Sequence, residues 1–378
     1  MSVKDYRIGD KIIDCKPLVH CLKVDKKSDY CDNCFGRISK QSKCLLEALK
    51  CSDCLQMYYC CYDCKMCDLR IHQKECKIFE KYFNTNLEHH FYRIILRLYL
   101  LSIEDKRFST QQYELYDGNR RCLNQLETHF SQIKKDLNLL SHFQFIYGTV
   151  YLSSKQFGFQ WDYQLLDQLF CRFVINHFDI LSYSKTRSEP IGSGLYIEPS
   201  VLNHSCQPNA ATIYFGTTLV LKAIKPIKRG EEITICYVDL EMDRIERQKL
   251  LKNSFYFECQ CIRCESNDFE VDYNLFNELK KKMKSESMKE TPDWSAISQL
   301  SDRWVDISFQ IYGRFHPQLT PILIEILSAK FQNKAENSNH FNKYLKQLQQ
   351  IVELIFGSNH SLYKTFEECI KTQSFTGF

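Results

Sequence analysis

Cysteine and histidine residues at metal-binding spacings crowd one part of the sequence. Of the 20 cysteines in 378 residues, ten lie between Cys31 and Cys76. Eight candidate ligands are paired as Cys31-x2-Cys34, Cys51-x2-Cys54, Cys60-x3-Cys64 and His72-x3-Cys76. A tetrahedral zinc ion needs four thiolate or imidazole ligands, so eight of them predict two zinc sites. The plainer interpretation, ordinary buried thiols, explains single cysteines better than it explains a set of regular pairs.

Closed zinc sites of this kind are structural, because the metal supplies folding free energy to a segment too small for a core of its own. His72 and Cys76 are four residues apart and share a face if this stretch is helical. Cys44, Cys61 and Cys67 are surplus to the pairs, and we expect them to be unligated.

A second set of residues able to do chemistry follows in the last half of the chain. In order, it comprises Asn203-His204-Ser205-Cys206, Glu231-Glu232-Ile233-Thr234-Ile235-Cys236-Tyr237 and Cys259-Gln260-Cys261-Ile262-Arg263-Cys264. Taken singly, the Asn-His pair is typical of a turn that contains a satisfied histidine, and the tyrosine is typical of a core. Taken together in this order, the three pieces favour one shared site.

Composition narrows the class of protein. The net charge of +4 is mild, so charge alone neither demands nor excludes nucleic acid. We find no signal peptide in residues 1–30 and no apolar run of the ~18 residues that a membrane span needs. Many cysteines without a secretory signal are typical of metal binding in a reducing compartment. We therefore expect a soluble intracellular protein without a membrane partner.

The elements that must position these residues follow from hydrophobic periodicity. Residues 1–30 predict short strands, residues 86–180 predict helices, and residues 191–240 predict short strands again. We expect Gly192-Ser193-Gly194 to be a hinge into the strand at Leu195. Helices are expected again over 241–254 and in the C-terminal region. There, Tyr312-Gly313-Arg314-Phe315-His316 is echoed by Phe356-Gly357-Ser358-Asn359-His360, as in a helix-pair repeat.

The second set of residues resembles the SET domain family of protein lysine methyltransferases, including its zinc-bound post-SET segment. The paired cysteines, with Tyr59 before Cys60, resemble the MYND zinc finger. The combination is similar to the SMYD family, and it covers nearly the whole chain. The resemblance implies an α+β fold: a SET-type β core of short strands split by the finger, a helical insertion, and a C-terminal helical domain like tetratricopeptide repeats.

From that resemblance we expect six parts. They are the N-terminal part of the SET core at 1–30, the MYND finger at 31–76, the helical SET insertion at 77–190, the catalytic SET core at 191–240, the post-SET segment at 241–266 and the C-terminal domain at 267–378.

The resemblance also implies which ligands share a metal. One ion would be held by Cys31, Cys34, Cys60 and Cys64, and a second by Cys51, Cys54, His72 and Cys76. A third structural zinc would join Cys206 to Cys259, Cys261 and Cys264, and would clamp the post-SET segment over the active site.

The implied activity is transfer of a methyl group from S-adenosylmethionine to a lysine amine. The resemblance implies that Tyr237 lies beside the transferring methyl group and that Phe178 is a wall of the lysine channel. By the same resemblance the cofactor would be held by Asn176, Asn203, His204, Tyr237 and Phe257. A dry aromatic channel lowers the pKa of the lysine, because burial disfavours its charged form, so no dedicated base is required.

Two features of the sequence differ from the family pattern. Relatives carry an early strand with a Gly-x-Gly turn at the cofactor, and no such segment precedes Gly9. We therefore expect the first strand of the core to be missing, together with part of the pocket. The region after Cys264 is also short for the family, which predicts a more open substrate cleft.

Partners follow from the same resemblance. We expect a protein substrate with a target lysine, histone or non-histone, and a monomer that acts in the nucleus and cytoplasm. The finger is expected to bind a proline-rich peptide or aid chromatin targeting, and the C-terminal helices to bind other proteins. DNA binding is not expected, because the finger segment mixes acidic residues with its lysines. The alternative is a catalytically weak or inactive adaptor in which the SET core is a scaffold.

Overall fold

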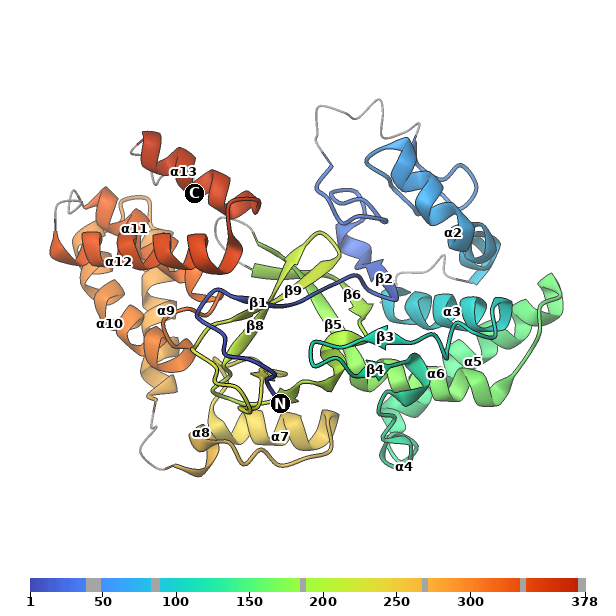
Figure 1. Cartoon of the computed structure of the whole chain (residues 1–378). Helices are drawn as coiled ribbons and strands as arrows, with labels where there is room; N and C mark the ends of the chain where they lie inside the picture. Colours follow the sequence, from blue (N-terminus) through green and yellow to red (C-terminus); the bar gives the residue numbers. More distant parts are fainter. Residues whose placement is uncertain (39–48, 83–88, 184–187, 267–270, 334–337, 373–378) are drawn as a thin grey trace.

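The computed structural model of the chain describes residues 1–38, 49–82, 89–183, 188–266, 271–333 and 338–372. Short strands form the middle of the molecule (Figure 1). The cysteine-rich segment and a layer of helices lie on one side of the strands, and the C-terminal helices lie on the other. The fold therefore mixes helices and sheets, as the sequence predicts.

The strands are short and pair across long distances in the sequence. They are β1 Lys11–Cys15, β2 Val19–Leu22, β3 Tyr113–Glu114, β4 Arg120–Arg121, β5 His177–Tyr183, β6 Ser188–Leu195, β7 Asn203–His204, β8 Ala210–Phe215, β9 Thr218–Ala223 and β10 Thr234–Ile235. They form sheets in the orders β1-β9-β8, β2-β6-β5, β10-β7 and β3-β4. The structure thus confirms the strands predicted near the N-terminus. It also shows that they pair with strands almost two hundred residues later in the sequence.

The helical layer next to the cysteine-rich segment buries one apolar face. It contains α3 His89–Glu104, α4 Phe130–Ile133, α5 Leu137–Phe157 and α6 Tyr163–Asn176, and α2 Tyr62–Tyr82, the helix of the cysteine-rich segment, lies against α3. Ile94, Ile95 and Leu98 of α3 are buried in one cluster with Leu169 and Phe173 of α6. These residues stand at the helical spacing noted in the sequence.

One boundary differs from expectation. The helical layer ends at Asn176, and the chain enters β5 at His177, well before the predicted start of strands at Ile191. Only Asn176 and His177 separate the apolar residues at the end of α6 from those of β5, with no glycine or proline at the boundary, so periodicity alone could not separate the two. The Gly192-Ser193-Gly194 stretch is likewise not a hinge but part of β6, paired with β2.

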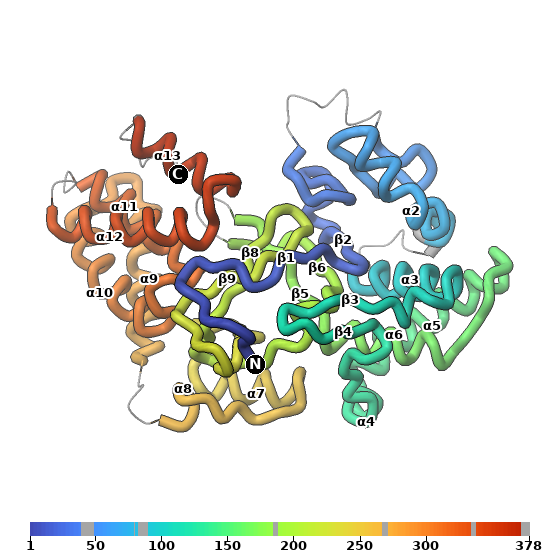
Figure 2. Tube along the Cα trace, viewed as in Figure 1, coloured from blue at the N-terminus to red at the C-terminus, as the bar shows by residue number. Residues whose placement is uncertain are grey.

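The C-terminal region is helical, as predicted. After α7 Arg244–Ser254 and α8 Ile262–Glu265 come α9 Tyr273–Ser287, α10 Trp294–Tyr312, α11 Leu319–Gln332, α12 Asn339–Ile351 and α13 Ser361–Thr372, with a π-helical turn at Val352–Phe356. The tube in Figure 2 shows α9 to α13 gathered on one side of the strands, with α7 and α8 apart from them below the strands. Gly313 and Gly357, at the two echoed motifs, end α10 and the π-helical turn with φ of +73° and +76°. The likeness to tetratricopeptide repeats stays a prediction.

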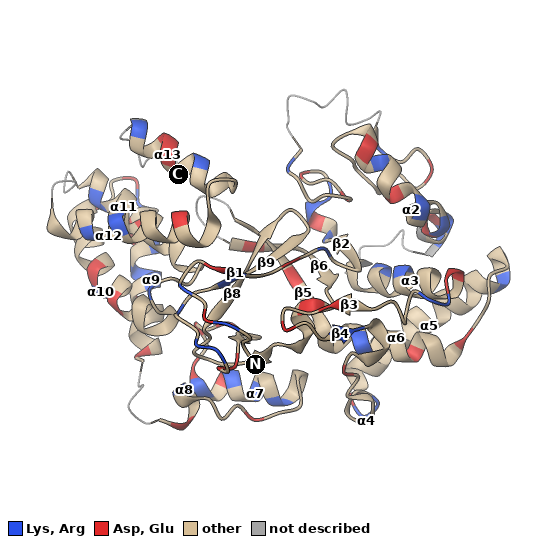
Figure 3. Ribbon diagram, viewed as in Figure 1, with Lys and Arg blue, Asp and Glu red and all other residues tan. Residues whose placement is uncertain are grey.

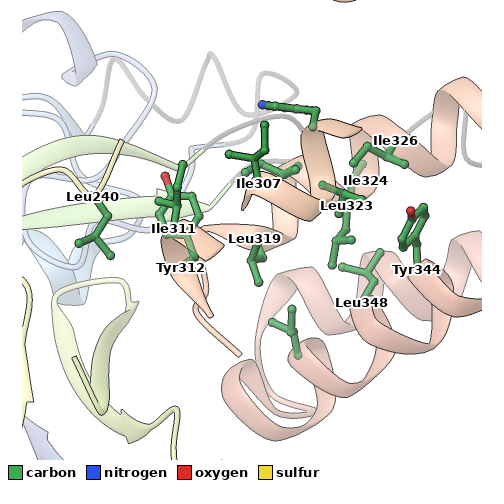
Figure 4. Packing of buried hydrophobic residues seen from close by; sticks show 14 of the residues in the cluster. Leu240, Ile307, Ile311, Tyr312, Leu319, Leu323, Ile324, Ile326, Tyr344 and Leu348 are labelled. Atoms are coloured by element: carbon green, nitrogen blue, oxygen red, sulfur yellow. The ribbon is translucent and has the colours of Figure 1, made fainter. Parts of the chain in front are cut away.

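The core of the C-terminal helices continues into the end of the strand region. Figure 4 shows Leu323, Tyr344 and Leu348 packed between helices, and Leu240 facing Ile311 and Tyr312 of α10. Tyr312 also donates a hydrogen bond from its hydroxyl to Glu241 Oε1 at 2.9 Å. The segment after Tyr237 is therefore fixed directly by the C-terminal helices.

Among the described residues, we find no helix that combines the length and the apolar character required to cross a membrane.

Candidate active site and metal centres

The first group of cysteines gathers at the start of α2. The sulfur atoms of Cys31, Cys34, Cys60 and Cys64 all lie within 4.8 Å of one another, and those of Cys60 and Cys64 are 3.5 Å apart. Phe35 follows the first pair with φ of +58°, and its N–H donates to the Cys31 carbonyl at 2.9 Å. This tight turn aims both thiols of the pair at the same point, so the group could hold one zinc ion.

The second group joins the same type of turn to a helix. Cys51, Cys54, His72 and Cys76 place their ligand atoms within 4.8 Å of one another. Leu55 repeats the turn with φ of +54°, while α2 puts His72 and Cys76 on one face. The structure therefore brings together the two interleaved sets expected from the sequence, and each set could hold zinc.

Glu75 fixes the orientation of the His72 ring. The ring Nδ1 is 3.3 Å from Glu75 Oε1, which leaves Nε2 free to ligate a metal. Glu75 also accepts hydrogen bonds from Arg93 and Arg97 of α3, at 2.7 and 2.6 Å. Asp68, His72 and Glu75 cluster closely enough to resemble a further metal site, but the two arginines already supply the positive charge there. This cluster is a buried charge network beneath the second group.

A third group lies beside the strands. Cys206, Cys259, Cys261 and Cys264 place their sulfur atoms within 4.8 Å of one another. Arg247, only 1% exposed, donates from Nε to the Cys206 sulfur at 3.2 Å. The four residues lie on two segments more than fifty residues apart, Cys206 on one and the other three cysteines on the other, and only their joint position makes a candidate zinc site. The surplus Cys61 and Cys67 are exposed and join none of the groups, and Cys44 lies outside the described residues.

Tyr237 and His204 are held together by the pairing of β7 and β10. These strands run parallel, with Asn203 opposite Thr234 and His204 opposite Ile235. The backbone N–H of Tyr237 then donates to His204 Nδ1 at 2.9 Å, and the two rings are 5.3 Å apart between centroids. Burial lowers the pKa of His204 to about 4, so its imidazole is neutral and accepts this bond.

The Tyr237 hydroxyl is protonated and anchored. Burial and the neighbouring Glu232 raise the pKa of Tyr237 to about 12. The hydroxyl donates a hydrogen bond to the Leu202 carbonyl oxygen. Its oxygen lone pairs therefore remain available to accept a hydrogen bond from another group.

Two cavities approach Tyr237. The smaller cavity, of about 440 Å³, is lined by His204, Glu232, Thr234 and residues 257–262. The larger cavity, of about 600 Å³, has Tyr237 in its wall and lies between the strands and the C-terminal helices. Since the Tyr237 ring contacts both His204 and Phe257 of the smaller cavity, this tyrosine stands between the two.

The other predicted site residues occupy varied positions. Phe257 lines the smaller cavity with its ring centroid 6.0 Å from that of His204. Asn203 is exposed and donates to Glu232 Oε1 at 2.7 Å, while Asn176 is 8% exposed and donates to the Glu127 and Arg172 carbonyls. Their contacts with a cofactor stay predictions.

Phe178 packs in the same cluster of strand residues as Tyr237 but does not line the larger cavity. Asp179, Leu181 and Tyr183 of β5 line it instead, because side chains alternate along a strand. A channel role for Phe178 stays a prediction.

Arg121 is a neighbour of Tyr237 that sequence reasoning missed. It lies on β4, donates to the Ser200 carbonyl at 3.3 Å, and its positive charge acts on Tyr237. No motif marks it, because its hairpin lies eighty residues before the strands of the site. Glu232 was visible in the sequence, yet only the structure shows that it faces the smaller cavity.

The chain is similar to known proteins over most of its length. The sequence profile of the SET domain matches residues 4–238. Histone-lysine N-methyltransferase SMYD3 of Mus musculus is 28% identical over 309 residues, which are 80% of this chain and 66% of the relative. N-lysine methyltransferase SMYD2 of Homo sapiens is 23% identical over 384 residues, 100% of this chain and 78% of the relative. The chain thus spans just under two thirds of the length of the SMYD3 relative that it matches.

Proposed function

Because the chain belongs to the SMYD family of SET domain proteins, we propose that it transfers a methyl group from S-adenosylmethionine to the ε-amine of a lysine in a protein. One observation carries this proposal: Tyr237 stands between two separate cavities. A direct transfer needs a donor and an acceptor that approach from opposite sides of one point.

The smaller cavity suits the cofactor. Phe257 offers an aromatic face for an adenine ring, and the carboxylate of Glu232 offers acceptors for sugar hydroxyls. We propose that Asn203, His204 and Asn176 complete this pocket, with His204 acting through the hydrogen bond that holds the Tyr237 backbone. S-adenosylmethionine would supply the activated methyl group, and these residues would orient it.

The larger cavity suits the lysine. Because the Tyr237 hydroxyl donates a hydrogen bond to the Leu202 carbonyl, its oxygen can accept a hydrogen bond from the lysine amine. That hydrogen bond would orient the amine so that the nitrogen lone pair points at the methyl group. Phe178, packed in the same cluster, is proposed to shape the narrow passage between the cavities. Burial of the amine there lowers its pKa and frees the lone pair for attack.

We further propose three structural zinc ions, one in each group of four ligands. The ion of the third group would hold residues 257–262 against the smaller cavity, so it supports cofactor binding without taking part in the transfer. For the finger we propose a proline-rich peptide as ligand, and histones as one substrate class, since SMYD3 relatives are named for histone lysine.

Methyl transfer from radiolabelled S-adenosylmethionine to a broad panel of proteins tests the proposal. We expect labelled lysine with the native protein, and about a 100-fold lower kcat for Tyr237→Phe, with cofactor affinity by calorimetry unchanged. Tyr62→Phe is the matched control, because Tyr62 is 64% exposed at the start of α2. Equal labelling by native protein and Tyr237→Phe would refute the role of Tyr237. If calorimetry detects no cofactor binding, the adaptor alternative replaces catalysis.

A further inference from the structure

A short aromatic run follows α7 and passes the candidate active site. Figure 3 shows charged residues on α7, whereas the three residues that follow this helix, Phe255-Tyr256-Phe257, are uncharged aromatic residues. The Phe255 ring lies 5.0 Å from the Tyr237 ring between centroids, and the Phe257 ring lies 6.4 Å from it at an interplanar angle of 89°. Both outer rings of the aromatic run therefore contact the proposed catalytic tyrosine.

The middle residue of the aromatic run points elsewhere. Tyr256 packs against the buried cluster of the helical layer, whereas Phe255 and Phe257 pack against the cluster that contains the C-terminal helices. The Tyr256 ring centroid lies 5.3 Å from that of His129, which is the N-cap of α4. Tyr256 thus anchors the aromatic run to the helical layer.

Both partners of this ring contact have a left-handed backbone. The φ angle is +62° for Tyr256 and +41° for His129, a region that residues with bulky side chains rarely occupy. Such conformations cost free energy and persist only where the surrounding structure holds them. Because φ of Tyr256 sets the direction in which the chain continues to Phe257, holding this angle also holds the position of the Phe257 ring.

The Tyr256 hydroxyl does not explain this conformation. It is buried and has no hydrogen-bond partner among the described residues. Burial raises the pKa of this hydroxyl, and its neighbours Asp136, the N-cap of α5, and Cys171 of α6 act in the same direction. The hydroxyl therefore lies close to α5 and α6, and the packing of the ring, not a polar contact, anchors the aromatic run.

Hydrogen bonds hold the chain just after the aromatic run. Gln248 of α7 donates from Nε2 to the Cys259 carbonyl at 2.7 Å, and its Oε1 accepts from the Cys259 N–H at 3.0 Å. Cys259 is also one of the candidate ligands of the third metal group. The aromatic run is therefore tied to α7 at both ends, while Tyr256 ties its middle to the helical layer.

We propose that Tyr256 is a positioning residue for methyl transfer: packed on His129, it holds the flanking rings of Phe255 and Phe257 against Tyr237. This inference rests on the proposed function, because it assumes that Phe257 faces the cofactor. Tyr256 lines neither cavity, so it acts through its two neighbours in the sequence. Residues that lock the side chains of a site control how precisely donor and acceptor are aligned.

Cofactor affinity by calorimetry and kcat provide the first test. For Tyr256→Ala we expect about a tenfold loss of S-adenosylmethionine affinity and about a tenfold lower kcat. Tyr256→Phe should match the native protein in both, because it keeps the ring and removes only a hydroxyl without a partner. The matched control is Tyr151→Ala, which removes a ring packed on Tyr147 and Trp161, outside both cavities, and should change neither quantity.

A double-mutant cycle tests whether Tyr256 acts through Phe257. If it does, Tyr256→Ala adds little to the loss of affinity caused by Phe257→Ala. His129→Ala removes the ring partner and should give a weaker form of the same loss, so it replaces Tyr256→Ala if that variant does not fold. Additive losses, unchanged affinity in Tyr256→Ala, or equal defects in Tyr256→Phe and Tyr256→Ala would overturn the inference.

The environment of the Phe257 ring separates the two proposals. With Phe257 replaced by 4-fluorophenylalanine, fluorine nuclear magnetic resonance reports on this one ring without any cofactor. We expect one narrow resonance, which Tyr256→Ala broadens or shifts and Tyr256→Phe leaves in place. An unchanged resonance in Tyr256→Ala refutes the inference and leaves methyl transfer intact. If the native protein binds no cofactor, the proposed function fails, and the resonance still decides whether Tyr256 positions Phe257.

Discussion

Arg97 and Glu75 form an ion pair that is closed off from solvent between two helices. Arg97 Nη2 is 2.6 Å from Glu75 Oε1 and Nε is 3.0 Å from Oε2, and both side chains are nearly unexposed. Glu75 belongs to α2, which carries two ligands of the second metal group, whereas Arg97 belongs to α3 of the helical layer. The pair therefore ties the cysteine-rich segment to the body of the protein.

We expect Arg97→Met to destabilise the protein by about 3–5 kcal/mol, because it keeps the volume but leaves buried carboxylates with one partner fewer. The control is Arg70→Met, which removes a 71% exposed arginine 3.8 Å from Glu104 and should cost less than about 1 kcal/mol. Urea unfolding, followed by circular dichroism, measures both. Midpoints that shift equally for the two variants would contradict a special role for the buried network.

Gly216, in the turn between β8 and β9, lies against the backbone of Cys34 in the first metal group. Its φ is +61°, and a Cβ at this position would lie 2.3 Å from the Cys34 carbonyl oxygen. Gly216→Ala should therefore displace Cys34 and weaken metal binding at the first group. Gly230→Ala is the matched control, because Gly230 has a φ of +83° but open space around it. Zinc release in the presence of a chromogenic chelator should be faster only for Gly216→Ala, and identical release rates would refute the steric explanation.

We expect the third metal group to support binding of the cofactor and the first metal group to have no effect on that binding. Cys261→Ser removes a ligand that also lines the smaller cavity, so we expect loss of one zinc ion and about a tenfold loss of S-adenosylmethionine affinity. Cys60→Ser should lose one ion and keep that affinity. Native mass spectrometry counts the ions and calorimetry gives the affinity, with Cys67→Ser as the control for an exposed cysteine outside the groups. Fewer than three ions in the native protein would remove one proposed site.

We expect Arg247 to strengthen zinc binding by the third metal group, although Arg247 is not itself a ligand. Its guanidinium donates to the Cys206 sulfur, to the Met242 carbonyl and to the Tyr273 hydroxyl, so it both offsets thiolate charge and holds α7 in place. We expect Arg247→Met to lower zinc affinity at this group about 10- to 100-fold, measured by competition with a chelator. Arg244→Met, at an exposed position of the same helix, should leave the affinity unchanged. A similar loss in both variants would indicate general damage to α7.

The sequence alone identified the SET domain family, the mixed fold and the paired candidate ligands of the cysteine-rich segment, because these signals depend on local spacing. The Cys-x2-Cys pairs that begin at Cys31 and Cys51 close the same local turn, as the positive φ of Phe35 and Leu55 shows. Helical periodicity likewise predicts a buried face from neighbouring residues only, and α3 and α6 follow it.

Tertiary structure decided what depends on segments far apart in the chain. Gly192 was expected in a hinge, but a Cβ there would meet the Cys21 carbonyl at 2.4 Å and the Phe35 ring at 2.6 Å, so this glycine instead allows β6 to lie against β2 and the cysteine-rich segment. The partnership of Arg97 with Glu75, and the meeting of Asp239 with Glu325 across one cavity, also have no local signature. A charge is buried or left unpaired only by what packs around it, and that packing exists only in the folded chain.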